Sequence, residues 1–586
     1  FENFLLGLSD FFTKKYLATQ KSITELKREI KEELSNRNKK IIITVDDIDR
    51  LNQSEIKQIF RLIRINGDFP NTIYLIAFDR KIVEENLEEQ IGVSGKDYLN
   101  KIVQVHFDVP FVKPSKISTF LFKELDRILG ILPEGAQKYF GKDDSYWTNV
   151  YHSGFKDFFK NIRDVKRFAS SLGFNISQMY QGNVMEVNPI DFIAIEAIRV
   201  FAPDFYSFMC DKNPLFTSTD RTGQNTRDDN PRKEEIEKGL RALPSETKKI
   251  VLKLLKRLFP QVDGIFRYGY STFGHEWQSS WSNSLRICST NNFDSYFTLI
   301  PGGDEDELSQ FEIEEILNKA DSVDGFEQIL REYIEKKKIR KVLQRMQDFT
   351  DDQSRISQEH ANNVVQALFN ISDDLPEEKV GMWDFGIDMD LMRIIYQLFK
   401  REEDKNKNFK VLKKAITLSK GLFGPVQGIS LESSRKKEGK GSDEFVVPED
   451  KIEELQRLCL EKINGTDIND LLKNKNLLYI LYRWKEWDNK DNVKVFIEKI
   501  ENDNQKLISL VVKFISESRS QRIGEYGVKI LKKFDYNSLA NFLDLDLVKT
   551  KLEEIKIQNS LEYRKDKETI DLFLNNFDKK DKSELD

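Results

Sequence analysis

The stretch "KKIIITVDDIDRL", residues 39–51, decides the fold of the N-terminal part of the chain. A short and almost wholly apolar run, 41–45, leads directly into the charged letters DDIDR. A continuous apolar run of this length, ended by polar residues, is typical of a strand that is buried in a sheet. We therefore expect a buried strand whose carboxyl end presents three carboxylates and one guanidinium.

The same pattern recurs further along the chain. "SEIKQIFRLIR" (54–64) has apolar residues at helical spacing, with Ser54 as the expected N-cap. "TIYLIAF" (72–78) is a second apolar strand, a helix is expected over 81–90, and "KIVQVHFDV" (101–109) is expected as a third strand. Strands that alternate with helices indicate a parallel sheet covered on both faces, and hence an α/β fold.

Three acidic residues would lie where these strands end. In a parallel sheet, ligands collect at the carboxyl ends of the strands, where Asp46, Asp47 and Asp79 are expected. Mg²⁺ prefers oxygen ligands, and phosphoryl transfer requires it beside the β- and γ-phosphates. Asp46 would hold the water shell of the metal, and Asp47 would orient or deprotonate the attacking water. Asp79 would touch the γ-phosphate, would cap the following helix, or would do both.

Composition narrows the classes of function. Among 586 residues, 92 Lys and Arg against 98 Asp and Glu give a net charge of −6, so no overall basic field indicates nucleic-acid binding. The three cysteines lie far apart and the four histidines do not cluster, which argues against a zinc site and a disulfide framework. This usage is typical of a reducing cytoplasm, which is the expected location. No apolar run approaches the ~18 residues that span a bilayer.

Five stretches taken together resemble the KAP family of P-loop NTPases. They are "IIITVDDIDRL", "IYLIAFDR", "GKDYLNKIVQVHFDVP", "NIRDVKRFASSL" and "DFIAIEAIRVFAPDFY", and the resemblance covers roughly residues 20–320. It implies an incomplete ASCE-type parallel sheet, followed by a large all-α region. It also implies ATP and Mg²⁺ as cofactors, and ATPase activity in the full-length parent.

The resemblance also implies roles for single residues. Asp46 and Asp47 match the Walker B acids, with Mg²⁺ held by Asp46 through water and by Asp47. Asp49 and Arg50 complete the DDxDR signature of the family and would help to bind the nucleotide, with Arg50 structural or at a subunit contact. Asp79 matches a sensor-1 position.

Two arginines further along fit a second family element. Arg163 and Arg167 lie four residues apart on one expected helix face, and the resemblance implies a sensor-2 or finger-type element that meets the phosphates. A surface ion pair with Asp157 or Asp164 is the alternative interpretation.

One family motif is missing from the sequence. A phosphate-binding loop has the pattern G-x-x-x-x-G-K-[ST], and none occurs among the 586 residues. "GVSGKDY" (92–98) and "GKGSD" (439–443) both lack its spacing. In the family the loop precedes the Walker B strand, so we expect it upstream of Phe1 and expect this chain alone to bind ATP poorly. Because family members often carry membrane helices in that interval, the membrane question stays open there.

The family resemblance and the composition together predict a division of the chain. The expected parts are the remainder of a P-loop core at 1–112, a helical lid with the sensor-2 element at 113–210, a mostly helical middle domain at 211–423, a linker at 424–450 and a C-terminal helical domain at 451–586. The linker is expected because that stretch is rich in Gly, Ser and charge and has few apolar residues.

The expected function is a KAP-type ATPase that couples Mg-ATP binding and hydrolysis to oligomer assembly or to a conformational switch. Family context implies antiviral defence against phage in a bacterium and a homo-oligomer. A separate effector protein is expected because residues 305–586 show no nuclease, deaminase or protease constellation. The alternative is a non-hydrolysing scaffold or sensor with a degenerate nucleotide site, whose helices from 305 onward bind a partner. Nucleic-acid binding by "EKKKIRKVLQR" (335–345) is a weaker alternative than a solvated helix face, because the run lacks interleaved aromatic residues.

Overall fold

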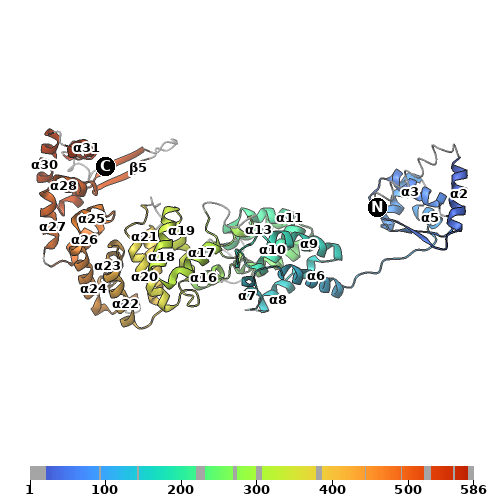
Figure 1. The fold of residues 1–586 in the computed structure, drawn as a ribbon, viewed down its shortest axis with the longest axis horizontal. Coiled ribbons are helices and arrows are strands. Elements are labelled where there is room, and N and C mark those ends of the chain that lie inside the picture. The colour runs from blue at the N-terminus through green and yellow to red at the C-terminus, as the bar shows by residue number, and fades with distance from the viewer. Residues whose placement is uncertain are drawn as a thin grey trace. The chain divides into compact units, whose positions relative to one another are not determined.

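The computed structural model divides into two compact units, Phe1–Phe111 and Val112–Asp586, and each is described by itself (Figure 1). The described residues are 22–66, 68–91, 94–141, 144–219, 231–267, 273–298, 307–377, 386–441, 444–489, 491–520, 529–558 and 561–577.

The first unit is built on a two-stranded parallel sheet. Strand β1 (Ile41–Val45) pairs with β2 (Thr72–Ile76), with Ile41 opposite Thr72 and Val45 opposite Ile76. The helices of this unit are α2 (Ile23–Ser35), α3 (Gln53–Asn66), α4 (Arg80–Ile91) and α5 (Gly95–Asn100). The buried side chains beneath one face of the sheet are Ile48, Ile56, Phe60, Val83, Leu87 and Leu99.

The other face of the sheet is not covered by described residues. Ile42 and Ile73 are register partners and therefore share a face, and Leu75 follows on that face because alternate residues of a strand point the same way. Their exposed fractions are 63%, 45% and 53%. The expected parallel pairing is confirmed, whereas the expectation of a sheet covered on both faces is wrong for the described part.

The expected third strand is also wrong. The chain from 101 to 109 forms no strand, and Val105, Phe107 and Val109 are 63%, 83% and 91% exposed. A strand needs a neighbour to complete its backbone hydrogen bonds, and no described strand pairs with this segment. The alternating pattern in the sequence is real, but a pattern alone supplies no partner.

The start of α3 corrects a second expectation. Asn52, not Ser54, is the cap: its Oδ1 accepts from the Glu55 N–H at 3.0 Å, and its own N–H donates to Glu55 Oε2 at 3.0 Å. This reciprocal pair is a capping box, which satisfies two backbone donors at once. Ser54 lies inside the helix, and its hydroxyl donates to Asn52 Oδ1.

The second unit is predominantly helical. Its first helices are α6 (Pro114–Leu129), α7 (Glu134–Gly141), α8 (Asp144–His152), α9 (Ile162–Ile176), α10 (Pro189–Phe201), α11 (Pro203–Cys210), α12 (Asn213–Thr217), α13 (Pro231–Leu240), α14 (Ser245–Leu258), α15 (Pro260–Phe266) and α16 (His275–Asn283), with a short hairpin of β3 (Tyr180–Gln181) and β4 (Val184–Met185). Next come α17 (Gln310–Asn318), α18 (Val323–Glu335), α19 (Ile339–Met346), α20 (Gln358–Ile371), α21 (Ile387–Lys400), α22 (Lys405–Leu418) and α23 (Phe423–Lys437).

The C-terminal helices continue the same architecture. They are α24 (Ile452–Gly465), α25 (Ile468–Lys473), α26 (Leu477–Trp487), α27 (Asn492–Glu501), α28 (Asn504–Val512), α29 (Tyr536–Ala540), α30 (Leu545–Ile557) and α31 (Leu561–Phe577), with a ribbon of β5 (Ile515–Ser520) and β6 (Lys529–Phe534). None of the described helices is long and apolar enough to cross a membrane.

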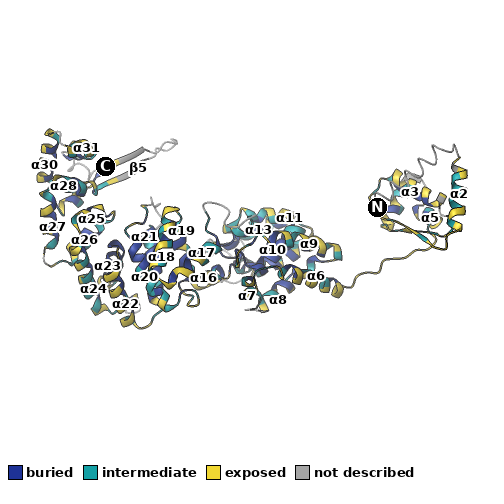
Figure 2. Cartoon of the chain, viewed as in Figure 1, coloured by how far each residue is buried: buried dark blue, intermediate teal, exposed yellow. Residues whose placement is uncertain are grey.

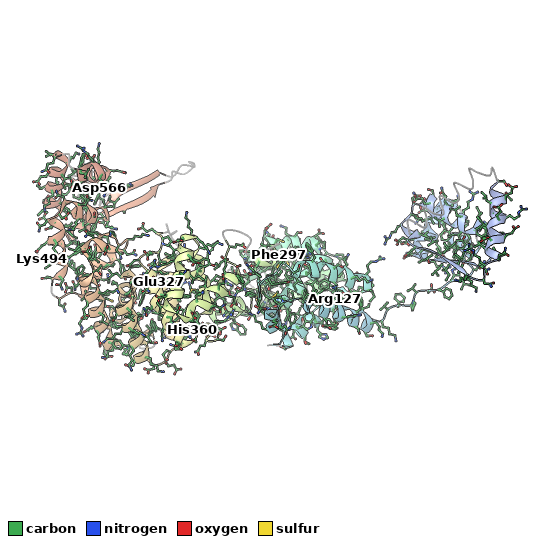
Figure 3. All side chains as sticks on the ribbon, in the orientation of Figure 1. Arg127, Phe297, Glu327, His360, Lys494 and Asp566 are labelled. Atoms are coloured by element: carbon green, nitrogen blue, oxygen red, sulfur yellow. The ribbon has the colours of Figure 1, made fainter. Side chains whose placement is uncertain are left out.

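Two apolar cores hold the second unit together. One runs from Ile117 to Tyr296 and includes most of α10, which is buried nearly all round (Figure 2). The other runs from Ile313 to Phe577. Figure 3 marks Arg127 and Phe297 in the half of the unit that holds the first core, and Glu327 and His360 in the half that holds the second.

The expected linker at 424–450 is wrong over its first half. Helix α23 is packed against α20, and Gly424, Val426 and Ile429 are buried. A Cβ at Gly424 would lie 2.8 Å from Ser372 Cβ, which is closer than real Cβ atoms approach. Glycine is therefore present because two helices approach closely, and not because the chain is a flexible connection.

Candidate functional site

The carboxyl ends of β1 and β2 meet at one edge of the sheet. Val45 is opposite Ile76, and the Ala77 N–H continues the ladder by donating to the Val45 carbonyl oxygen at 2.9 Å. Because the strands are parallel, Asp46 and Asp79 follow their strands at this same edge. The arrangement that the sequence predicts for these acids is therefore present.

Ile48 explains why the acids and the apolar residue alternate. Its side chain is fully buried, whereas the two preceding residues, Asp46 and Asp47, are exposed. Asp47 has φ 59° and ψ 28°, a left-handed conformation that Asp adopts more readily than most residues. The chain thus turns sharply directly after β1, and the two carboxylates stay at the strand end while Ile48 enters the core.

Local bonds orient both carboxylates. The Asp47 N–H donates to Asp46 Oδ1 at 2.8 Å, and Arg50 Nε lies 3.2 Å from Asp47 Oδ1. The Arg50 and Asp47 side chains are 65% and 56% exposed, and exposed pairs of this kind contribute only about 0–1 kcal/mol. Arg50 therefore positions Asp47 more than it stabilises the fold, and the half-buried Asp49 lies between them in the turn.

Asp79 caps the helix that follows β2. Its Oδ1 accepts from the N–H groups of Lys81 at 3.0 Å and Ile82 at 3.2 Å, which satisfies two donors at the start of α4. The capping interpretation is thus confirmed. Asp79 is exposed, and its Oδ2 makes no hydrogen bond within the described residues, so the cap leaves one oxygen available at the edge.

The donor set at this edge suits a magnesium ion that is bound together with a nucleotide. No group of three or more His, Cys, Asp or Glu in the described part of the chain could hold a metal ion by itself. Mg²⁺ usually takes one or two carboxylates, and water and phosphate oxygens complete its octahedron. Exposed oxygens of Asp46 and Asp47 meet that requirement, with the phosphates supplied by the ligand.

Arg163 and Arg167 lie on α9 in the second unit, and both are exposed. Asp164 does not pair with them: its Oδ2 accepts from the backbone N–H of Lys160 at 3.0 Å and of Asn161 at 3.3 Å. Neither arginine has an ion pair in the part of the chain that the structure describes, so the ion-pair alternative is not found. The Arg167 guanidinium lies 4.9 Å from the ring centre of Phe201, which holds it by a cation–π contact.

The basic run at 335–345 is largely committed to internal contacts. Lys338 Nζ donates to the Glu307 carbonyl at 2.7 Å, and Arg345, with a side chain 14% exposed, pairs with Asp348 at 2.9 Å. Arg340 lies 3.7 Å from Asp390. The expected solvated helix face is therefore only partly correct, and few of these cations remain to meet a nucleic acid.

Two capping residues and one cation–π contact were not identified from the sequence. Asn52 and Asn161 each begin a capping box with an acid three residues later, and the N-x-x-E and N-x-x-D patterns could have identified both. The contact of Arg167 with Phe201 joins residues on two different helices, so no local pattern indicates it.

Comparisons with known proteins identify the N-terminal part. Residues 6–178 match the model of the KAP family P-loop domain. The N-terminal part is therefore a KAP P-loop domain with a small parallel sheet, followed by a mostly helical region, as the sequence predicts. A P-loop domain implies nucleotide binding in general, and the matched range includes Asp46, Asp79 and both arginines of α9.

A curated protein is similar to a short part of the chain. The chain is 33% identical over 105 residues to the phage T7 exclusion protein of Escherichia coli (strain K12). The similar stretch spans 18% of this chain and 14% of that protein, so the likeness concerns a small part of each. No solved structure matches the chain.

Proposed function

We propose that this protein is an ATPase of the KAP type, in which Mg-ATP binding and hydrolysis drive oligomer assembly or a conformational switch. The observation that carries the proposal is the placement of Asp46, Asp47 and Asp79 at one edge of a parallel sheet, inside a range that matches a P-loop domain. Carboxylates at the ends of adjacent strands can hold a metal and a water on the same side of a nucleotide.

Each residue has a distinct task in the proposal. Asp46 holds Mg²⁺ through water, and Asp47 binds the metal and orients the attacking water. Asp79 contacts the γ-phosphate through the oxygen that the helix cap leaves available. Arg163 and Arg167 of a neighbouring subunit would complete the site and stabilise the charge that develops on the transferred phosphoryl group, as arginines do in other NTPases. Mg²⁺ would neutralise charge on the β- and γ-phosphates.

Anti-phage defence is the proposed setting. It is supported by the likeness to a phage T7 exclusion protein, and that likeness is short. We propose a homo-oligomer and a separate effector protein as partners. The effector is proposed because the described residues after 305 are mostly helical and contain no group of three or more His, Cys, Asp or Glu that could hold a catalytic metal. A cytoplasmic location is consistent with three reduced, well-separated cysteines.

A second candidate function is a non-hydrolysing sensor with a degenerate nucleotide site. The two candidates differ in the family motif G-x-x-x-x-G-K-[ST], which does not occur among the 586 residues: an intact copy upstream of Phe1 in the full-length protein would favour the ATPase, and a broken copy would favour the sensor. Under this alternative, nucleotide binding alone would set the conformation of the helical region, and Asp47 would have no kinetic role.

Substitution of Asp47 separates the two candidates. In the full-length protein, Asp47→Asn is expected to abolish phosphate release from Mg-ATP while ATP binding stays largely intact, because the amide cannot activate water. The matched control is Glu88→Gln, which neutralises an exposed carboxylate on α4 away from the strand ends. Undiminished hydrolysis in Asp47→Asn would remove Asp47 from its assigned role, and absence of hydrolysis in the unaltered protein would favour the sensor.

A further inference from the structure

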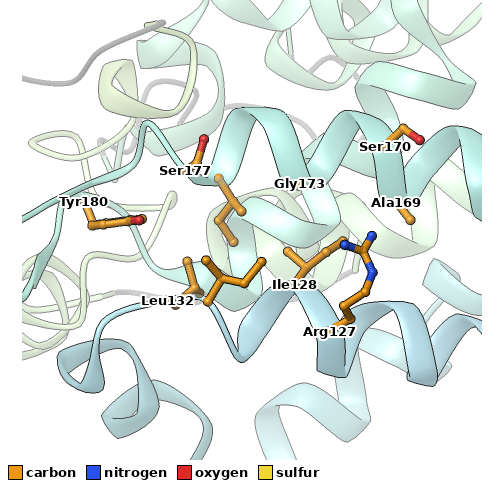
Figure 4. Close-up of a pocket in the computed structure, with 10 residues that line it drawn as sticks. Arg127, Ile128, Leu132, Ala169, Ser170, Gly173, Ser177 and Tyr180 are labelled. Carbon is orange, nitrogen blue, oxygen red and sulfur yellow. The ribbon is translucent and has the colours of Figure 1, made fainter.

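A small groove lies between α6 and α9 in the second unit. It encloses about 260 Å³, and its floor is formed by the buried side chains of Ile128, Ala169 and Ile176. Figure 4 shows Ile128 on α6, and Leu132 just after the end of α6, facing α9, which carries Ser170 and has Ser177 as its C-cap. The groove is thus an apolar slot with one small-residue wall.

The small residues of α9 are the reason that the slot exists. Ser170, Gly173 and Ser177 are spaced three and four residues apart, so they form one stripe on the helix and none projects far. A Cβ at Gly173 would lie 3.7 Å from Ile128 Cγ1, which is an ordinary van der Waals distance. The space therefore results from missing side-chain volume and not from separated helices.

Two large apolar side chains stand exposed near the slot. Ile131, which lines it, is 67% exposed, and Phe174, on α9 next to the small-residue stripe, is 66% exposed. Single exposed apolar residues need no explanation, but two beside an apolar slot form a surface of the kind that binds partners.

A positively charged residue lies on the same face of α9 as the small-residue stripe, nearer to the start of the helix. Lys166 lies four residues before Ser170, is exposed, and has no ion pair in the described part of the chain. Arg127 lines the slot from α6 with a side chain 61% exposed, and it pairs with Glu124 at 3.0 Å. The surface is therefore apolar at one end and cationic at the other.

We propose that this groove binds a peptide segment of a partner protein in which acidic residues adjoin a bulky apolar residue. The apolar side chain would fill the slot, and the acids would face Lys166. Pockets for drug-sized ligands and cofactors enclose ~300–1,000 Å³, so a volume of about 260 Å³ suits one or two side chains better than a nucleotide. Tyr180 is the one aromatic residue among those that line the slot, so the lining favours an apolar side chain over a run of bases, which stack on several aromatic side chains. The proposal does not depend on the nucleotide site.

A library of random peptides displayed on beads tests the proposal without a known partner. The full chain is the target, and no selection against the variants is applied, so that their later measurement is an independent test. We expect a consensus of acidic residues beside Leu, Ile, Met or Phe. Absence of a consensus, or a polar or basic one, would overturn the proposal.

The selected peptide is then measured by fluorescence anisotropy. Gly173→Leu is expected to weaken the affinity for the peptide by about tenfold or more, since the apolar side chain of the peptide loses its site. Lys166→Glu should weaken it about threefold to fivefold, while the matched charge reversal Lys410→Glu, on the exposed face of α22, leaves it unchanged.

Two further measurements exclude simpler explanations. Gly173→Ala also replaces a helical glycine but leaves most of the slot open, so it should retain binding within about threefold. Thermal melts followed by circular dichroism check that each variant is folded. Equal binding to Gly173→Leu and the unaltered chain would overturn the proposal. The proposal would also be overturned if a single-stranded oligodeoxythymidine probe competed with the peptide and if Lys166→Glu weakened binding of this probe more than binding of the peptide.

Discussion

Asp191→Asn is expected to destabilise the second unit severely. Asp191 is fully buried near the start of α10, and three donors surround its carboxylate. Arg286 Nε donates at 2.8 Å, the Ile287 N–H at 2.9 Å, and the Tyr146 hydroxyl also donates to it. These bonds connect α8, α10 and the chain that follows α16, which lie far apart in the sequence.

The size of the destabilisation follows from the buried charge of Arg286, which the substitution leaves without its partner. Burial by itself lowers the pKa of Arg286, yet the Asp191 carboxylate holds that pKa above its usual value, so the guanidinium stays charged. Its side chain is 14% exposed and lies 4.0 Å from the centre of the Tyr146 ring. Removal of one partner of a buried ion pair costs about 3–5 kcal/mol, because the other charge remains buried and uncompensated. The asparagine oxygen can still accept from Ile287.

Urea unfolding, monitored by tryptophan fluorescence, measures this loss in the free energy of unfolding, because Trp281 is buried in the same apolar core. Asp204→Asn, an exposed acid on α11, is the matched control and should change the free energy of unfolding by about 0.5 kcal/mol or less. In the double variant Asp191→Asn, Arg286→Met, both charges are gone, so the loss should be smaller than the sum of the two single losses. A loss below about 1 kcal/mol for Asp191→Asn, or strict additivity, would refute the reasoning.

Three other predictions concern the second unit. Burial raises the pKa of the Glu327 carboxyl, but hydrogen bonds from Lys420 and other donors outweigh it and hold that pKa below its usual value. The stabilising effect of the charged carboxylate is therefore present above the usual pKa and is lost as the pH falls through the folded-state pKa. The destabilisation caused by Glu327→Gln should accordingly shrink between pH 7 and pH 3 in urea titrations, and a constant difference would contradict the assignment. Asn161→Ala should cost about 0.5–2 kcal/mol by removing the cap of α9, and an unchanged urea midpoint would contradict this. Burial raises the pKa of Cys288 and Cys459 to about 12, so neither should react with Ellman's reagent at pH 8 until the chain unfolds, and rapid labelling of the native chain would show that they are accessible.

The sequence predicted those elements whose signals are local. The apolar runs of β1 and β2 and the helix at 81–90 are short-range patterns. β1 lies at the expected residues, and the ends of β2 and of the helix differ from the expectation by at most two residues. The edge position of Asp46 and Asp79 follows from parallel pairing alone, so it too was predictable.

The failures share a physical cause. The alternating residues from Val103 to Phe111 have the pattern of a strand, but a strand also requires a hydrogen-bonding neighbour that a local pattern does not guarantee. The glycines of α23 suggested a linker because composition does not reveal that Phe369 and Ser372 approach them closely. The contact of Arg167 with Phe201 depends, likewise, on a neighbour that only the fold provides.

The central claim is that Asp46 delivers a carboxylate to a metal-bound nucleotide. Electron paramagnetic resonance of Mn²⁺, added with ATP to the full-length protein, tests it most directly, because the free ion and the bound ion give different spectra. The account predicts that Asp46→Asn weakens nucleotide-dependent Mn²⁺ binding by about tenfold or more, as the loss of a metal-facing carboxylate should, and that Glu88→Gln leaves it unchanged. Equal Mn²⁺ binding by Asp46→Asn and the unaltered protein would contradict the account.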